Sequence, residues 1–146
     1  MHHKIEHYPI NITQLYGITR DPETKNYIMV FDYAENGSLR NYLDTNYDKL
    51  SWKNKFNDLR YIANGIDKIH EKELIHRDLH IGNILRFSDN YNSPSRITDM
   101  GLCKPADYNK LENTNNNNVY GVLPYIAPEI LRGQNYTKLL VFIVLV

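Results

Sequence analysis

The stretch ELIHRDLHIGNILRF, residues 73–87, decides the fold because it gathers two histidines, an aspartate and an asparagine into one short segment. His76 and His80 have the H-x-x-x-H spacing that places two zinc ligands on one face of a helix. In such a helix a glutamate follows the first histidine, whereas Arg77 follows it here. Gly82 would also break the helix soon after His80. The stretch therefore predicts a loop between two short strands.

Taken alone, the two histidines are typical of ordinary packing residues, but three further features occur in order along the chain. Asp78 precedes Asn83 within the loop, Asp99-Met100-Gly101 follows a later strand, and Tyr125-Ile126-Ala127-Pro128-Glu129 closes a polar segment. In this order they resemble the catalytic loop, the metal-binding tripeptide and the Ala-Pro-Glu element of the protein kinase family. The resemblance implies an α+β, protein-kinase-like two-lobed fold, truncated at both ends in this chain.

Four segments sharpen the likeness: YGIT (16–19), YAENGSL (33–39), HRDLHIGNIL (76–85) and GVLPYIAPEIL (121–131). They most resemble the tyrosine-kinase-like group of protein kinases, of a kind abundant in fungi. The implied reaction is ATP-dependent transfer of a phosphoryl group to a protein hydroxyl in signalling. Serine/threonine is favoured over tyrosine as the acceptor, although the segment before Ala-Pro-Glu has neither group's usual form.

The candidate catalytic residues follow from what this reaction needs. Phosphoryl transfer leaves little covalent work to the protein, so positioning and charge neutralisation dominate. By resemblance, Asp78 would accept or orient the proton of the substrate hydroxyl, Asn83 would bind a magnesium ion, and Asp99 would bridge magnesium to the phosphates. Oxygen ligands of this kind suit Mg²⁺. ATP and Mg²⁺ are therefore the implied cofactors, and a protein is the implied substrate.

The resemblance also assigns an activation segment that ends at Glu129. Arg77 would receive a phosphate carried by this segment, for which Thr114, Tyr108 and Tyr120 are the candidates. The alternative for Arg77 is a solvated or structurally paired arginine.

The nucleotide site is implied by the likeness of NYIMVFDY (26–33) to the last small-lobe strand running into the interlobe hinge. Phe31 would then stand at the gatekeeper position beside adenine, and Asp32 and Ala34 would offer backbone groups to the adenine edge. Leu85 would form the floor beneath the ring. Each of these residues also suits an ordinary place in a strand core.

Three positions depart from the family pattern. His80 stands where serine/threonine kinases have a lysine, and Val122 stands where the threonine that contacts this lysine is usual. An imidazole is charged only in part near neutral pH, so we expect slower chemistry that speeds up as the pH falls. Met100 replaces the usual phenylalanine of the metal-binding tripeptide, and we expect it to pack against His76 and Leu15.

Local patterns predict the elements that carry these motifs. Residues 11–18 and 26–33 predict two antiparallel strands joined by an Asp-Pro turn. Ser38 is a candidate N-cap for a short helix over 39–45, and Ser51 for a longer one. In the longer helix a stripe at spacings of three and four is expected to pack inward, made up of Trp52, Phe56, Leu59, Ala63, Ile66 and His70.

We expect three parts along the chain. Residues 1–34 would be a remnant of the small lobe with its strands and hinge, and residues 35–138 the first half of the helical large lobe with the catalytic loop and activation segment. The apolar tail 139–146 matches no family segment, and it is too short for a bilayer crossing, which needs about 20 helical residues. The family's glycine-rich loop and strand lysine would lie before Asn11, so we expect little activity from the chain itself.

Composition narrows the partners. Basic and acidic residues number 17 each, the formal net charge is +0, and no charge run marks a polyanion-binding tail. We therefore expect neither a nucleic-acid nor a membrane partner. The single cysteine, Cys103, cannot form an intrachain disulfide and suits a reducing compartment, where it would be a small packing residue. No apolar leader is visible, so a cytoplasmic or nuclear location is expected.

Three functions remain open from the sequence. The first is an active protein kinase. The second is a catalytically inactive kinase fragment or pseudokinase that acts only as a binding module. The family's strand lysine and the helix glutamate that pairs with it are not found in this sequence, which would favour this function. The third is another phosphotransferase, such as a small-molecule kinase, against which the Ala-Pro-Glu element argues.

Overall fold

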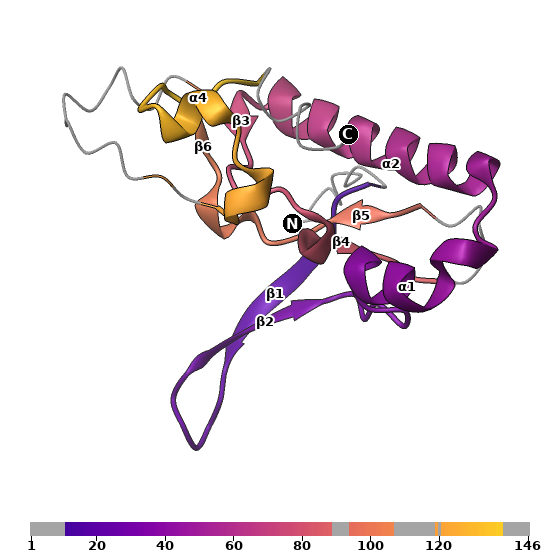
Figure 1. The fold of residues 1–146 in the computed structure, drawn as a ribbon. Helices are drawn as coiled ribbons and strands as arrows, with labels where there is room; N and C mark the ends of the chain where they lie inside the picture. The colour runs from indigo at the N-terminus through magenta and orange to yellow at the C-terminus, as the bar shows by residue number, and fades with distance from the viewer. Residues whose placement is uncertain (1–10, 89–93, 107–118, 120, 139–146) are drawn as a thin grey trace.

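The computed structural model describes residues 11–88, 94–106, 119 and 121–138. Its strands and helices, in chain order (Figure 1), are β1 (Leu15–Arg20), β2 (Tyr27–Phe31), α1 (Leu39–Asn46), α2 (Trp52–Glu71), β3 (Leu74–Ile75), β4 (Ile84–Leu85), β5 (Arg96–Ile97), β6 (Lys104–Pro105) and α4 (Pro128–Leu131). Helices and small antiparallel sheets together confirm the α+β class. No helix in the described part of the chain is long and apolar enough to span a bilayer.

Strands β1 and β2 form an antiparallel hairpin that projects from the helical part of the molecule (Figure 1). The carboxylate of Asp21 closes the turn by accepting the backbone N–H groups of Glu23 and Thr24 at 2.7 and 3.1 Å, as the Asp-Pro signal predicted. The predicted start at residue 11 is wrong for β1. Asn11 and Thr13 bond the backbone of Ile97 instead, so this stretch joins the hairpin to the helical part.

Both predicted helix caps are confirmed. The hydroxyl of Ser38 accepts the N–H of Asn41 at the start of α1, and that of Ser51 accepts the N–H of Asn54 at the start of α2, each at 3.3 Å. These bonds satisfy backbone donors that the first helical turn leaves without a partner. The local sequence therefore sets where both helices begin.

The predicted inward stripe of α2 is correct only in its second half. Trp52 and Phe56 are 85% and 68% exposed, whereas Ile66 is buried. The residues that face inward along the helix are Asp58, Ile62, Gly65, Ile66, Ile69 and His70. The predicted stripe began at the large apolar side chains of Trp52 and Phe56, which are exposed, and it therefore left out Asp58 and Ile62. Asp58 is buried because a cation meets it inside.

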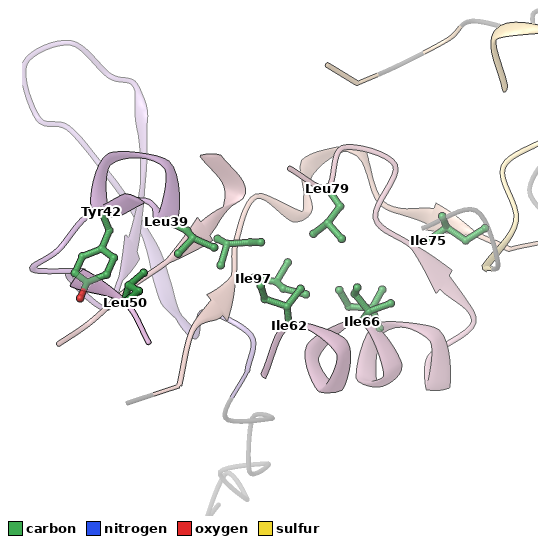
Figure 2. Close-up of a cluster of buried hydrophobic side chains, with 10 residues drawn as sticks. Leu39, Tyr42, Leu50, Ile62, Ile66, Ile75, Leu79 and Ile97 are labelled. Carbon is green, nitrogen blue, oxygen red and sulfur yellow. The ribbon is translucent and has the colours of Figure 1, made fainter. Parts of the chain in front are cut away.

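The hydrophobic core runs along one side of α2. Figure 2 shows Tyr42 and Leu50 beside α1, then Ile97 close to Ile62, and Ile75 at the far end. The β4–β5 and β3–β6 pairs are antiparallel and only two residues long on each strand. The predicted hairpin over 84–98 is confirmed at its flanks, while its middle, 89–93, lies outside the described residues. The core thus fastens the chain on either side of the motif-bearing loop to α2.

A buried ion pair joins α2 to the β4–β5 hairpin. Nη1 of Arg86 donates to both carboxylate oxygens of Asp58 at 2.5 and 2.6 Å, and the hydroxyl of Ser95 donates to Asp58 Oδ1 at 2.8 Å. The Arg86 guanidinium also lies over the ring of Tyr42, 4.4 Å from its centre. The two opposite charges therefore neutralise each other where water is excluded. Removal of either side chain would leave the other charge buried without a partner of opposite sign.

Breaking this pair should destabilise the protein strongly. Asp58→Ala leaves the Arg86 charge buried without its carboxylate, and we expect a loss of about 3–5 kcal/mol in the free energy of unfolding. The double variant Asp58→Leu/Arg86→Leu should recover most of the loss, because no charge stays buried. Urea unfolding followed by circular dichroism measures both.

The matched control is Lys68→Ala, which removes an exposed pair, Lys68 to Glu71 at 2.6 Å, and should change stability by less than about 1 kcal/mol. A loss in Asp58→Ala no larger than that of the control would contradict the prediction.

Candidate functional site

The loop after β3 is not helical. Residues 76–80 connect β3 to a single 3₁₀ turn at Ile81–Asn83, and Arg77 adopts the left-handed region with φ 68°. The two imidazoles therefore do not lie on one face of a helix, which confirms the loop that the sequence predicted. A non-glycine residue in this region costs conformational energy, and such residues cluster at functional sites.

His76 lies at the centre of the loop and is 1% exposed. Its Nε2–H donates to the carbonyl oxygen of Thr98 at 2.9 Å, while its Nδ1 accepts the backbone N–H of Asp78 at 3.3 Å. Burial lowers the pKa of His76, so the ring stays neutral. A neutral ring with its proton on Nε2 satisfies both bonds at once, whereas a charged ring would set two N–H groups against each other at Nδ1.

Asp78 and Asn83 meet across the same loop. Nδ2 of Asn83 donates to the backbone carbonyl of Asp78 at 2.9 Å and to its Oδ2 at 3.3 Å. The other carboxylate oxygen of Asp78, Oδ1, is buried and accepts no hydrogen bond from the described residues. The amide of Asn83 is oriented by its nitrogen, which leaves its oxygen as a potential ligand.

Asp99 is tied to this loop through its neighbour Thr98. The backbone N–H of Thr98 donates to the carbonyl of Asn83 at 2.9 Å, and its own carbonyl accepts from His76. Asp99 itself is exposed, adopts φ 59°, and accepts the N–H of Gly101 on Oδ1 at 3.3 Å. Thr98 thus holds the backbone that leads to Asp99, after β5, beside the carbonyl of Asn83, which directly precedes β4.

The donor set fits a hard cation. Within the described ranges, no three His, Cys, Asp or Glu side chains gather into a ready-made metal cluster. Asn83 and Asp99 offer an amide oxygen and a carboxylate, ligands that Mg²⁺ takes together with waters and substrate phosphates. Cys103 is no candidate ligand, because burial raises the pKa of its thiol to about 11. Its Sγ lies 3.9 Å from the carbonyl of His76 and 3.7 Å from Sδ of Met100, so it packs within the site.

His80 points toward Asp78. Its Nδ1 accepts the backbone N–H of Gly82 at 3.0 Å, and its Nε2 lies 3.7 Å from Asp78 Oδ1. The ring of Tyr125 packs against it with centres 5.8 Å apart. In the neutral form the proton is therefore on Nε2, on the side of the carboxylate.

A small hollow of about 40 Å³ adjoins Asp78. Gly121 has φ 115°, and a Cβ placed there would come within 3.1 Å of the Arg77 carbonyl, so the position requires glycine. Val122 also lines the hollow and offers no polar group to His80. The residues that line it are Arg77, Asp78, Leu79, Gly121, Val122, Tyr125, Ile126, Ala127, Ile130 and Tyr136.

A larger cavity of about 640 Å³ opens between the root of the β1–β2 hairpin, the end of α2 and the Asp99 turn. Phe31 and Asp99 line it, together with Leu15 and Met100, whereas the predicted adenine-site residues Asp32, Ala34 and Leu85 are not among its described lining. Leu15 and Met100 both line this cavity, and Sδ of Met100 contacts Cys103, while the packing of Met100 against His76 and Leu15 stays a prediction.

The activation-segment candidates are only partly described. Thr114, Tyr108 and Tyr120 lie outside the described residues. The Arg77 guanidinium lies over the ring of Tyr136, 4.5 Å from its centre. Glu129 is in the first turn of α4, and its Oε2 is buried with no hydrogen-bond partner among the described residues.

Sequence reasoning missed Thr98 and Tyr125. Thr98 acts through backbone groups, which any residue would supply, so no side-chain signal could reveal it. Tyr125 could have been considered, because an aromatic residue before Ala-Pro-Glu falls within the motif already quoted.

The buried neutral His76 predicts acid-sensitive stability. An unfolded histidine has a pKa near 6.5, and the folded pKa is lower, so below pH 6.5 the unfolded state binds a proton that the folded state does not. This contribution is complete above pH 6.5 and is lost as the pH falls toward the lowered pKa. In His76→Gln, the loss of stability between pH 7.5 and 5.5, measured by urea unfolding, should be smaller than in the wild type.

His70→Gln is the matched control. Burial also lowers the pKa of His70, but this residue is 9% exposed, so its substitution should flatten the pH dependence less. An unchanged pH dependence in His76→Gln would show that His76 does not titrate in this way.

Comparison with known proteins agrees with this geometry. A family model described as protein tyrosine and serine/threonine kinase matches residues 1–139. The chain is 35% identical to the L-type lectin-domain containing receptor kinase V.5 of Arabidopsis thaliana and 31% identical to the serine/threonine-protein kinase atg1 of Dictyostelium discoideum, with 87% of the chain covered in each case. It is 33% identical to the cysteine-rich receptor-like protein kinase 6 of rice over 89% of the chain.

The matched part is about a fifth of the length of these relatives, 19%, 18% and 19% respectively. They come from plants and an amoeba, so the likeness to fungal kinases stays a prediction. The loop in which Asp78 faces Asn83, the Thr98 link to Asp99 and the family match agree with one another, and the chain belongs to the protein kinase family.

Proposed function

We propose that this chain supplies the catalytic loop and metal-binding residues of a serine/threonine protein kinase, which transfers the γ-phosphoryl group of ATP to a protein hydroxyl. The observation that carries the proposal is the bonding of Thr98 to both Asn83 and His76, which joins the backbone before Asp99 to the loop that carries Asp78 and Asn83. The Dictyostelium relative is a serine/threonine-protein kinase by name, which supports serine/threonine as the acceptor class.

Asp78 is suited to orient the attacking hydroxyl. Its Oδ2 is occupied by Asn83, while Oδ1 accepts no hydrogen bond from the described residues and adjoins the small hollow beside Val122. A substrate hydroxyl that donates to Oδ1 would be aligned for attack and would give up its proton as the new P–O bond forms. His76 holds the backbone of Asp78 in place through Nδ1 and so acts as a positioning residue.

Asn83 and Asp99 are the residues that would hold Mg²⁺ against the phosphates of ATP. When bound, the ion neutralises charge on the phosphate oxygens. The contribution of the chain is to fix the two ligands beforehand, which it does through the Asn83 amide bonds to Asp78 and the strained turn at Asp99. Phe31 and Asp32 are proposed to border the adenine, with Ala34 beside them and Leu85 beneath.

A second function, a binding module without catalysis, has one specific observation in its favour. His80 presents an imidazole to Asp78 where the family's lysine would present a full positive charge, and Val122 offers it no hydrogen bond. A chain that binds nucleotide but transfers no phosphoryl group at any pH would support this second function. For the kinase function we also propose a cytoplasmic or nuclear location, with neither nucleic acid nor a membrane as partner.

Substitution of Asp99 should separate metal-dependent binding from binding of the base. In Asp99→Asn we expect the Mg²⁺-dependent part of ATP affinity to fall about tenfold or more, because a charged ligand becomes neutral. Binding of adenosine should not change. Ligand-detected NMR in the millimolar range measures both affinities. The control is Asp48→Asn, which removes an exposed carboxylate in the 3₁₀ turn Tyr47–Lys49 after α1. An Asp99→Asn result equal to this control would count against the metal role.

Substitution of Asp78 should affect transfer and not binding. Asp78→Asn replaces the carboxylate with an uncharged amide that cannot take up the proton, and we expect transfer of labelled phosphate to a basic test protein to slow about 10²–10⁴-fold with ATP affinity unchanged. An equally active Asp78→Asn chain would exclude this role for the carboxylate.

The role of His80 can be separated from its backbone bond by two variants. His80→Lys introduces a permanent positive charge near Asp78 and should raise the transfer rate. His80→Asn can still accept the Gly82 N–H but carries no charge, and should be slower than His80→Lys. Equal transfer rates for the wild type and both variants would remove His80 from the chemistry.

A further inference from the structure

The orientation of the β1–β2 hairpin is set at its root. Figure 1 shows the hairpin reaching away from α1 and α2, and most of its large side chains are exposed, Ile18 by 63% and Met29 by 60% among them. Packing therefore contributes little to its orientation. At the first attachment point, the Thr13 N–H donates to the carbonyl of Ile97 and the Ile97 N–H donates to the carbonyl of Asn11, each at 2.8 Å.

The second attachment point is a cluster of three side chains, Tyr16, Asp32 and Arg96. Asp32 is the residue that follows β2. The hydroxyl of Tyr16 donates to Asp32 Oδ1 at 2.5 Å, and Nη1 of Arg96 donates to Asp32 Oδ2 at 2.5 Å. The Arg96 guanidinium also lies over the ring of Phe87, 4.3 Å from its centre. One carboxylate thus joins β1, the end of β2 and the first residue of β5.

This cluster holds one end of the hinge, which we define as residues 32–36. The other end is held by the backbone, because Asn36 N–H donates to the carbonyl of Arg86 at 3.2 Å and Arg86 N–H donates to that of Gly37 at 2.9 Å. At Asp32 the side chains of Tyr16 and Arg96 supply the bonds instead. Arg96 is also the direct partner of Leu85 across the β4–β5 pair. The cluster therefore sets the start of the hinge relative to the strand that carries Leu85.

The protonation states agree with this bonding. The hydrogen bond from Tyr16 is the main cause that lowers the pKa of Asp32, and the bond to Asp32 is the main cause that raises the pKa of Tyr16. Near neutral pH the carboxylate is therefore ionised and the phenol keeps its proton. These are the states in which Asp32 accepts from both neighbours.

We propose that Tyr16 and Arg96 are positioning residues that fix Asp32, and with it the hinge, at the distance from Leu85 that an adenine ring requires. The nucleotide part of this inference rests on the proposed function. The mechanical part rests only on the three side chains and their bonds. Neither residue touches the ring in this proposal, since the backbone of Asp32 and Ala34 would do so.

Hydrogen exchange of the hinge amides tests the mechanical part in the full 146-residue chain without nucleotide. We expect Arg96→Met to raise exchange on the order of tenfold at Asn36 and Gly37, whose N–H groups donate to the carbonyls of Arg86 and Ala34. Tyr16→Phe should raise it less, because the charged bond is lost in the first variant and a neutral donor in the second. Arg96→Lys keeps a cation beside Asp32 and should restore most of the protection.

Tyr27→Phe is the matched control, because it removes one hydroxyl from an exposed tyrosine of the same hairpin. Exchange in α2 serves as the internal standard for global unfolding and should stay at the wild-type level in every variant. Hinge exchange in Arg96→Met equal to that in Tyr27→Phe would overturn the proposal, as would a rise that α2 shares.

Adenosine binding, measured by ligand-detected NMR, tests the nucleotide part. Arg96→Met should weaken adenosine and ATP by the same factor, about three- to tenfold, because only the base is affected. Weakening of ATP alone would place the effect at the phosphates and contradict the hinge role. If the wild-type chain binds neither molecule, the proposed function fails. The exchange measurement still decides whether Tyr16 and Arg96 hold the hinge.

Discussion

Both backbone groups of Thr98 are engaged, and the candidate site depends on this constraint. Its N–H reaches back to Asn83 and its carbonyl accepts from the His76 ring, so the chain that leads to Asp99 cannot move without moving the loop. His76 can do this only because it is buried and neutral, with one nitrogen donating and the other accepting. The positions of Asp78, Asn83 and Asp99 follow from these few bonds.

Strands β4 and β5 are also joined to α2, by a buried ion pair. Arg86 follows β4 and Ser95 precedes β5, and both donate to Asp58 of α2. A buried pair of this kind adds little net stability compared with apolar residues of equal size, but it penalises any register that separates its partners. In a hairpin whose strands are two residues long, such a penalty can determine the register where backbone bonds alone are too few. The ion pair thus supports the geometry that Thr98 completes.

Much of the local structure could be predicted. The Ser38 and Ser51 caps, the Asp21 turn and the hairpin pairing of the two first strands were all visible, because each depends on residues close together in the chain. The inward face of α2 was predicted correctly only near Ile66, since the predicted stripe began at large apolar side chains that are exposed and left out Asp58. The roles of the site residues remain proposals, and their proximity is what the structure adds.

The sequence by itself determined the family, the order of its motifs and the places where helices begin, because periodicity, capping and motif spacing are local properties of the chain. Only the tertiary structure decided which side chains meet. His76 and Thr98 lie 22 residues apart, Asp58 and Arg86 28, and Asp32 and Arg96 64, and no local pattern links the members of these pairs. The first two pairs are selected when the chain around β3, β4 and β5 packs against α2 and removes the water that would otherwise satisfy each polar group. Asp32 and Arg96, 28% and 26% exposed, are joined by their opposite charges where the β1–β2 hairpin meets β5.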